Sequence, residues 1–333
     1  MNLLATTTQY GYWTPPLYSQ HGTKIDDLIS TVHVFMLVIF IPWLCIFVYW
    51  LWQFRARPGH RATYQPIHAK ASKVAEIGVI LFEAFLLLGM SMPVWATYKN
   101  DPPKAGERTE VRVIGEQYQW NFHYPGKDGI FGKTDSKLIS ASNPIGLVES
   151  DPAAADDIVR INECHLPVNK PIYVRLTTKD VIHSFSIPTM RVKQDAIPGM
   201  EIPIWFTVDS AATSDKIREE MTATYEVSGL DWYKIRHMIA AEECKSSGGE
   251  VMLAKGADLG LDLKAGQEMI EKLAKAGIKT VKLQPRNPME VVCAQLCGNS
   301  HFKMKAQLIT HTEADYNKWV EEAGKKQEMK VDF

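Results

Sequence analysis

Two apolar blocks near the start of the chain limit what it can fold into. Residues 28–54 contain no Lys, Arg, Asp or Glu, and residues 74–98 contain only two charged side chains, Glu76 and Glu83. A helix rises about 1.5 Å per residue, so each block is long enough to cross a hydrocarbon layer about 30 Å thick. The blocks therefore predict a transmembrane helical hairpin, residues 28–98, in a lipid bilayer.

The connector between the blocks predicts how the hairpin is oriented. It has no acidic residue and contains five basic ones, Arg55, Arg57, Arg61, Lys70 and Lys73. Because loops rich in Lys and Arg stay on the cytoplasmic side, residues 1–27 and the region after Lys99 should face outward. Residues 1–27 lack the pattern of a secretory signal, so we interpret them as an exposed external arm.

Beyond the break at residues 101–106, short segments with period-two alternation are separated by turns rich in Pro, Gly and Asn. Such punctuation is typical of an antiparallel sandwich. We therefore predict an all-β Greek-key sandwich formed by residues 106–208 and 291–325. Its expected strands are residues 110–114, 118–124, 158–162, 171–177, 182–187, 202–208 and 305–310. A short amphipathic helix should follow at residues 313–324.

Residues 209–290 interrupt this pattern with a segment of balanced charge that we interpret as a partly helical insert. Asp231 can cap one helix, and a second is expected at residues 263–276, ended by Gly277. The first helix should present one apolar face, formed by Trp232, Ile235 and Ile239. The insert lacks a Cys-x-x-Cys-His motif for c-type haem, and it either docks a partner or packs passively on the sandwich.

Charge and cysteine content narrow the function further. A formal net charge of −1 argues against a nucleic-acid partner. Of the five cysteines, Cys45 lies in the first apolar block. Cys164 and Cys244 fall in the external region, where an oxidising compartment would allow a disulfide between them. The remaining two cysteines are candidate metal ligands.

These two belong to the run Cys293-Ala-Gln-Leu-Cys297-Gly-Asn-Ser-His301-Phe-Lys-Met304, which offers two thiolates, an imidazole and a thioether within twelve residues. Copper takes this ligand set in electron-transfer sites, whereas structural zinc usually takes four Cys or His ligands. A second imidazole is available upstream at His183, in a segment patterned like a strand. A structural zinc site, or a disulfide between the two cysteines, is the alternative.

The motif Cys-x-x-x-Cys-Gly-x-x-His-x-x-Met is preceded here by Asp-Val-x-His-Ser-Phe and by Lys-Gln-Asp-Ala-x-Pro-Gly at residues 193–199. Together these motifs resemble the binuclear copper (CuA) domain of cytochrome c oxidase subunit II. The resemblance implies a cupredoxin fold in which two thiolates bridge both coppers and one histidine caps each. The implied ligands are His183, Cys293, the backbone carbonyl of Gln295, Cys297, His301 and Met304.

The chain departs from the family pattern at three places. The tryptophan that takes electrons from cytochrome c corresponds to Tyr118 here, and Trp120 matches the next aromatic position. Gln295 replaces a glutamate whose carboxylate also reaches a magnesium ion beside subunit I, and an amide binds that ion more weakly. The long insert at residues 209–290 has no counterpart in the usual pattern.

Charged side chains within membrane spans are functional candidates. Glu76 lies seventeen residues before Pro93, the spacing that the family has for the glutamate at the mouth of a proton path into subunit I. The resemblance therefore implies that role for Glu76. For Glu83 it implies none, and a hydrogen bond across the helix interface is the simpler interpretation.

The resemblance implies a subunit of a haem-copper oxidase that accepts electrons from cytochrome c, or from a cytochrome-bearing partner complex. It passes them to the haem of subunit I for oxygen reduction coupled to proton translocation. The expected location is a bacterial inner membrane, crossed more than once, with the copper domain on the periplasmic side. A CuA-containing subunit of a nitric oxide reductase and a membrane-anchored copper delivery protein are alternatives. A quinol oxidase subunit should lack the copper ligands.

Overall fold

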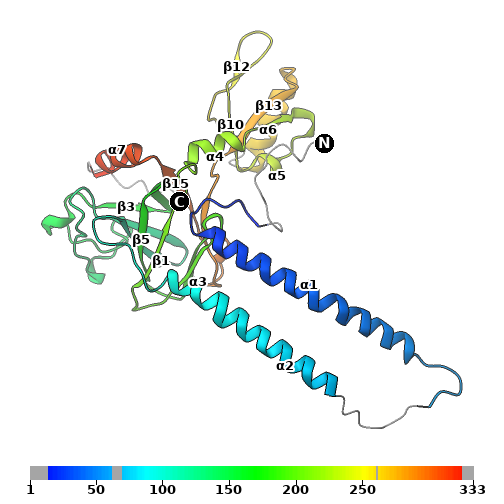
Figure 1. Ribbon diagram of the computed structural model, residues 1–333. Helices are drawn as coiled ribbons and strands as arrows, with labels where there is room; N and C mark the ends of the chain where they lie inside the picture. Colours follow the sequence, from blue (N-terminus) through cyan, green and yellow to red (C-terminus); the bar gives the residue numbers. More distant parts are fainter. Residues whose placement is uncertain (1–13, 62–69, 260–261, 325–333) are drawn as a thin grey trace. The chain divides into compact units, whose positions relative to one another are not determined.

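The computed structural model describes residues 14–61, 70–259 and 262–324. The chain forms two compact units (Figure 1), one at His21–Pro102 and the other combining Met1–Gln20 with Pro103–Phe333. The first unit is helical. The second contains the β-sandwich and the insert.

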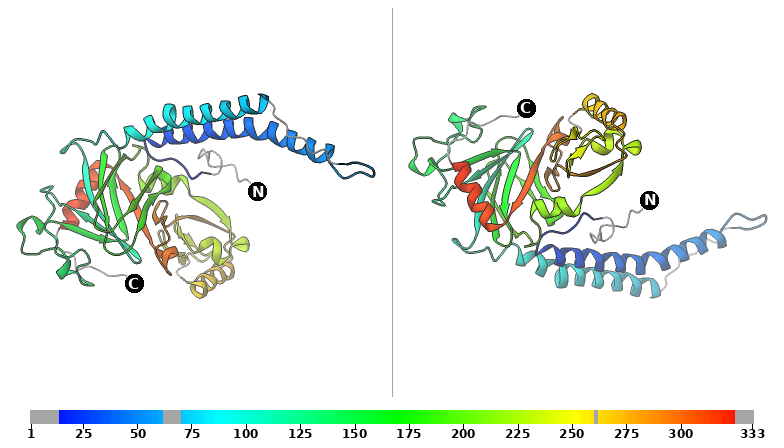
Figure 2. Two further views of the ribbon diagram at one scale, coloured as in Figure 1. Left: turned by 90° about the horizontal axis from the view of Figure 1, so that it is seen from below. Right: turned by 90° about the horizontal axis from the view of Figure 1, so that it is seen from above.

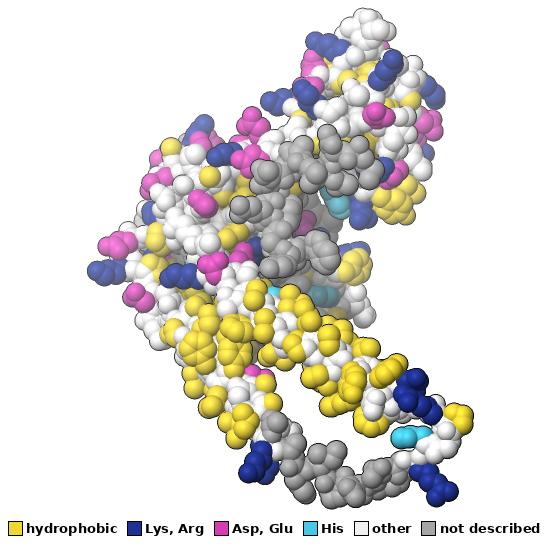
Figure 3. All heavy atoms as spheres, turned by 45° about the vertical axis from the view of Figure 1, so that its right-hand side comes forward, with side chains coloured by type: hydrophobic (Ala, Val, Ile, Leu, Met, Phe, Trp, Pro, Cys, Tyr) yellow, Lys and Arg dark blue, Asp and Glu magenta, His cyan; other side chains and the backbone are white. Residues whose placement is uncertain are grey.

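Two long apolar segments form the helical unit, as predicted. The first is α1 Gly22–Gln53, which begins six residues before the predicted start. The second runs through α2 Lys70–Ala84, the π-helical η2 Phe85–Ser91 and α3 Met92–Thr97. The rings of Phe35 and Phe82 lie 4.2 Å apart between them. By length and composition both segments can cross a membrane, and Figure 3 shows apolar side chains covering the visible face of this unit. Residues 62–69 of the basic connector lie outside the described residues.

The second unit contains two five-stranded sheets, which confirms the predicted sandwich. The first has the order β3-β2-β1-β5-β8 and the second β4-β15-β14-β6-β7. Pairing is parallel for β1 with β5 and for β4 with β15, and antiparallel elsewhere in these two sheets. The strands are β1 Thr109–Glu116, β2 Gln119–Tyr124, β3 Ile158–Ile161, β4 Glu163–Pro167, β5 Pro171–Thr178, β6 His183–Ile187, β7 Val192–Ala196, β8 Ile202–Thr207, β14 Glu290–Cys293 and β15 Lys305–His311.

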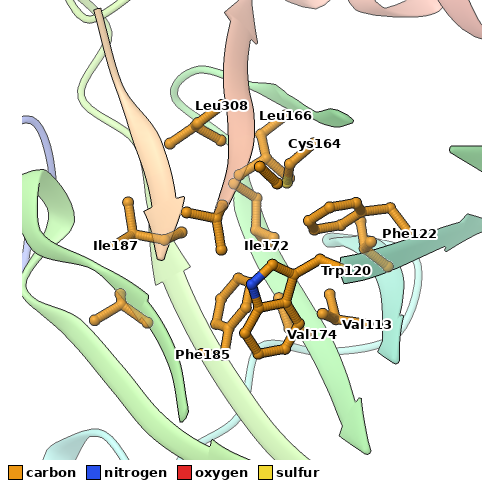
Figure 4. Packing of buried hydrophobic residues seen from close by; sticks show 14 of the residues in the cluster. Val113, Trp120, Phe122, Cys164, Leu166, Ile172, Val174, Phe185, Ile187 and Leu308 are labelled. Atoms are coloured by element: carbon orange, nitrogen blue, oxygen red, sulfur yellow. The ribbon is translucent and has the colours of Figure 1, made fainter. Parts of the chain in front are cut away.

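The sandwich core lies between the inner faces of the two sheets (Figure 4). Strand β5 alternates strictly, burying Ile172, Val174 and Leu176. Trp120 and Phe185 approach from the two sheets and meet edge to face, with ring centroids 5.5 Å apart. A buried aliphatic or aromatic side chain stabilises a fold by about 1.5–3 kcal/mol relative to exposure. This alternation made β5 recognisable in the sequence.

Helix α7 Glu313–Gly324 also agrees with its predicted range and lies against the sandwich (Figure 2). Its Tyr316 is buried, and Trp319 and Val320 are half-buried against the sandwich core. The apolar positions of this helix therefore face the sandwich as the sequence pattern indicates.

The segment before the first helix differs from the prediction of an exposed arm. Within its described part, Tyr18 donates its backbone N–H to the carbonyl of Thr189. The carbonyl of Tyr18 accepts the backbone N–H of Asp209. The Ser19 hydroxyl is buried and donates to the carbonyl of Met190 at 2.7 Å. Residues 14–20 therefore lie on the sandwich, because hydrogen bonds to two of its loops satisfy their backbone groups. Residues 1–13 lie outside the described part.

The insert is partly helical, as predicted, but it also contains a sheet that the sequence pattern did not predict. The sheet has the order β10-β13-β9, and a hairpin joins β11 to β12. These elements are β9 Ala223–Glu226, α5 Trp232–Ile235, β10 Met238–Ala240, β11 Cys244–Lys245, β12 Val251–Leu253, α6 Leu263–Lys275 and β13 Thr280–Pro285. They enclose a separate core that includes Val227, Ile235, Leu273 and Leu283.

Of the two helices expected in the insert, one is confirmed and the other is much shorter than expected. Helix α6 is confirmed, with Asp262 capping its start and Gly277 following its end at φ 74°. Asp231 does cap α5, but that helix has only four residues, and Ile239 lies in β10 rather than on its face. The prediction for Ile239 was wrong because β10 pairs with β13 and takes the chain out of the helix.

The first helix after β8 belongs to the sandwich rather than to the insert. Ile217, on α4 Ser214–Glu220, is buried in the sandwich core. The Ser214 hydroxyl accepts the backbone N–H of Thr310 in β15 at 2.8 Å. The independent body of the insert therefore begins after α4.

The predicted disulfide between Cys164 and Cys244 does not form, since both are free thiols. Cys164 is buried in the sandwich core, whereas Cys244 packs against the core of the insert. The hypothesis was wrong because the two cysteines belong to different cores.

Candidate metal centre

The candidate centre lies at the edge where β6, β14 and β15 adjoin. Cys293 ends β14 and is in register with Phe185 of β6, two residues after His183. On its other side, Cys293 donates its backbone N–H to the carbonyl of Met304, just before β15. Strand pairing thus places the upstream histidine and the end of the loop on either side of the first cysteine.

The structure brings together all six predicted ligands. The sulfurs of Cys293 and Cys297 lie 3.9 Å apart and form no disulfide. His183 Nδ1 is 3.8 Å from the Cys293 sulfur, and His301 Nδ1 is 3.5 Å from the Cys297 sulfur. The other two contacts are Cys297 Sγ to Met304 Sδ at 3.8 Å and Cys293 Sγ to the Gln295 carbonyl at 3.2 Å.

The two histidines do not converge on a single point. His183, Cys293 and Cys297 form a group whose donor atoms all lie within 4.8 Å of one another. Among the described residues, His301 is outside that group, although it contacts Cys297. Each imidazole therefore faces a different sulfur. A tetrahedral zinc site would need four ligands around one position, and the fourth candidate, His301, lies outside the group of three.

The two thiols differ in acidity. Burial opposes ionisation of Cys293, but hydrogen bonding with His183 and with the surrounding backbone outweighs it and lowers its pKa. Burial and the neighbouring Cys293 thiolate raise the pKa of Cys297. Burial also opposes protonation of His183, yet contacts with Cys293 and Asp180 raise its pKa. Cys293 and His183 can thus share one proton, and a metal that binds the Cys293 thiolate would displace it.

Two side chains that the sequence analysis did not single out support the centre. Asp180 Oδ1 lies 2.9 Å from His183 Nε2 and so directs the other ring nitrogen, Nδ1, toward Cys293. Gln117 donates its side-chain amide to the carbonyl of Cys297 at 2.6 Å. Asp180 lies three residues before His183, within the motif Asp-Val-x-His-Ser-Phe, so its contact with His183 could have been inferred from the sequence. Nothing in the local sequence pattern indicates the contact of Gln117.

The two aromatic candidates for accepting electrons lie at different depths. Trp120 is fully buried, with its ring centroid 6.0 Å from that of His183. Tyr118 is half-buried and lies beside the loop, where a Cβ on Gly298 would come within 2.5 Å of its hydroxyl. Of the two, only Tyr118 has surface that another protein could touch.

Glu76 and Glu83 lie on α2 in the helical unit. The predicted proton-path role of Glu76 concerns a partner subunit and stays a prediction.

Two histidines outside the candidate centre contact each other. His165 Nδ1 and His311 Nε2 are 2.8 Å apart, and the ring of His165 stacks on Trp319 at 4.1 Å. Burial and, to a smaller extent, the neighbouring His165 lower the pKa of His311 to about 4. Burial likewise lowers the pKa of His165. The two histidines meet because β4 and β15, which carry them, pair in parallel.

Taken together, an apolar helical hairpin and a β-sandwich with a soft-ligand cluster at one edge define a membrane-anchored protein of the cupredoxin class. The family model described as cytochrome c oxidase subunit II, periplasmic domain, matches residues 109–214. This matched segment covers strands β1–β8 of the sandwich, so the part of the chain beyond the apolar hairpin is similar to that periplasmic domain.

Individual proteins show the same relationship. The chain is 28% identical over 312 residues to the alternative cytochrome c oxidase subunit 2 of Bradyrhizobium diazoefficiens, covering 93% of this chain and 84% of that one. It is 26% identical over 210 residues to cytochrome c oxidase subunit 2 of Cereibacter sphaeroides, covering 58% and 66%. A crystal structure of the periplasmic domain of cytochrome oxidase subunit II from Bradyrhizobium japonicum matches 68% of this chain and 98% of its own, with 21% identity and a TM-score of 0.32.

Proposed function

We propose that this chain is the electron-accepting subunit of a cytochrome c oxidase. It receives electrons from cytochrome c, or from a cytochrome-bearing partner, at a binuclear copper centre, and subunit I uses them to reduce oxygen and translocate protons. The observation that carries the proposal is the donor arrangement, in which each histidine faces a different sulfur of the same cysteine pair. Similarity to subunit II proteins supports it.

The residues present fit a pair of copper ions. Cys293 and Cys297 would bridge both ions, His183 and His301 would each bind one, and Met304 and the Gln295 carbonyl would be the weak ligands. When bound, the pair supplies a reversible one-electron centre whose charge is shared over two metals. Soft thiolate and thioether donors with imidazole are the ligands that copper prefers.

The protein's own contribution is to hold these donors in place and to limit access of water. Both cysteines are at least nine-tenths buried, at 8% and 5% exposed. Asp180 fixes the orientation of the His183 ring. Because burial and orientation are set by the sandwich before a metal arrives, little rearrangement accompanies a change of charge.

Two large apolar side chains are exposed next to the ligands and fit a docking face for the electron donor. Leu296, beside Cys297, is 78% exposed, and Phe302, beside His301, is 70% exposed. Large apolar side chains exposed beside a buried site are typical of protein contact surfaces. Tyr118 borders the same loop, so we assign the electron-accepting position to Tyr118, with the buried Trp120 beside His183.

Three further roles follow from the same proposal. Gln295, with an amide in place of a carboxylate, would bind magnesium at the subunit I interface only weakly. Glu76 would lie at the mouth of a proton path into subunit I. The hairpin would cross a bacterial inner membrane twice, which leaves the N-terminal segment and the copper domain in the periplasm.

Copper loading of the full chain in detergent tests the proposal. The wild type should bind two copper ions per chain and show the intense purple absorption of a thiolate-bridged pair. Cys293→Ser should abolish that absorption and reduce binding to at most one ion. Cys244→Ser, which removes a thiol from the insert, is the matched control and should behave as wild type. A wild-type chain that took up a single ion, or only zinc, would contradict the proposal.

A further inference from the structure

The short turn between β1 and β2 contacts both halves of the ligand set. The backbone N–H of Gln117 donates to Asp180 Oδ2 at 2.7 Å, and the other oxygen of that carboxylate lies 2.9 Å from His183 Nε2. The side-chain amide of the same residue donates to the Cys297 carbonyl at 2.6 Å. One residue therefore links the histidine on β6 to the second cysteine of the loop.

We propose that Gln117 is a positioning residue that fixes the distance between the His183 half and the Cys297 half of the centre. This inference rests on the proposed function for its consequence, since the two halves would hold one copper pair between them. Gln117 touches neither metal position in this role. It acts through Asp180 on one side and through the backbone of the loop on the other.

The need for such a link follows from how the ligands are placed. His183 and Cys293 lie on paired strands, so the sheet register fixes their separation. Cys297 lies in the loop beyond β14, outside any strand, and its distance from His183 is not fixed by register. The amide of Gln117 reaches across to that loop and supplies the missing constraint.

The loop is shaped to receive this amide. Gly298 follows Cys297 with φ 141°, and a Cβ there would lie 2.9 Å from Gln117 Nε2 and 2.5 Å from the Tyr118 hydroxyl. Only a glycine allows the loop backbone to approach the turn this closely. The close approach and the hydrogen bond thus occur at the same point.

Two substitutions separate the hydrogen bond from simple space filling. Gln117→Asn keeps the amide but shortens the side chain by one methylene, so the amide cannot reach the Cys297 carbonyl. Gln117→Glu keeps the length but places a carboxylate, which cannot donate, against that carbonyl. Both retain the backbone N–H that Asp180 accepts. Gln119→Asn is the matched control, because Gln119 lies in the same strand region and directs its amide to Glu116 instead.

The full chain in detergent is loaded with Cu²⁺, and copper loss to excess EDTA is followed together with the visible absorption. We expect both Gln117 variants to lose copper about tenfold faster than wild type, because removing a group that supports a metal ligand typically weakens metal binding at least tenfold. Their thiolate-to-copper bands should also shift. Gln119→Asn should match wild type in both measurements. Gln117 variants that match wild type in rate and spectrum would overturn the inference.

Hydrogen exchange on the copper-free chain distinguishes failure of this inference from failure of the proposed function. Both Gln117 variants should exchange the backbone amides of residues 297–300 faster than wild type, whether or not the wild type binds copper. If the wild type bound no copper pair, the proposed function would fall while the exchange result still decided the role of Gln117. Unchanged exchange would overturn the positioning role by itself.

Discussion

The sandwich and the insert each bury a separate hydrophobic core, but only the sandwich provides the candidate metal ligands. In the sandwich, the ligands come from strands far apart in sequence, with His183 and Cys293 separated by 110 residues. The insert occupies much of that separation, and none of its described residues contributes a donor atom to the cluster. The pairing of β6 with β14 therefore brings His183 and Cys293 together across this separation.

Matched truncations in the two cores should give the largest effects. Phe185→Ala and Ile235→Ala each remove a side chain that is at most 1% exposed, the first from the sandwich and the second from the insert. Both should lower stability, by about 3–5 and 2–5 kcal/mol respectively, because a cavity replaces buried apolar contacts. Denaturant unfolding followed by circular dichroism measures this loss.

The copper spectrum then separates the two variants. Phe185→Ala should shift the thiolate-to-copper bands, because Phe185 is in register with Cys293. Ile235→Ala should leave them unchanged. A spectral change in the insert variant would show that the two cores are coupled.

A smaller effect concerns pH and involves the sandwich alone. The pKa of His311 is lowered from 6.5 to about 4 in the folded chain. Between these values the unfolded chain binds a proton that the folded chain does not, so stability should fall as the pH drops from 6.5 toward 4. After allowance for the partial exposure of His311, the loss is about 1 kcal/mol.

His311→Gln should reduce this pH dependence when unfolding midpoints at pH 7 and pH 4.5 are compared. His237→Gln, a change at an exposed position before β10 in the insert, should leave the dependence as in wild type. Equal pH dependence in the wild type and His311→Gln would contradict the assignment to the histidine pair.

The smallest expected effect is that of removing the insert. Thr222 Oγ1 and Gln284 Oε1 lie 3.3 Å apart at its two ends, so a two-glycine linker can replace residues 223–283. Helix α4 is retained because Ile217 belongs to the sandwich core. The shortened chain should take up copper with the wild-type spectrum. Loss or displacement of the absorption bands would show that the insert helps to set the centre.

The sequence predicted the sandwich better than the insert for physical reasons. Strands such as β5 alternate over eight residues, which is long enough for the period to be recognised. In the insert, β9 and β10 have only four and three residues, and burial depends on partners distant in sequence. Strand β4 was missed because Asn162, with φ 56°, turns the chain directly from β3 into β4 without a Gly or Pro.

The candidate ligands were predictable because five of the six lie within one loop, so their spacing is visible locally. His183 was found by residue type and setting. Gln117 could not be found in the same way, because its contact depends on where the turn between β1 and β2 meets the loop, and that is a property of the folded sandwich. Short-range spacing therefore predicted the metal-binding donors, whereas their supporting contacts required the three-dimensional structure.

The near contact between Thr222 and Gln284 has a further consequence for engineering. Chain ends that meet this closely form an attachment point that accepts foreign sequence at low cost to the host fold. A small reporter or an electron-carrying module with adjacent termini could be grafted there. The graft would be tethered to the copper-binding sandwich by two short covalent links, with β14 still leading directly into the cysteine loop.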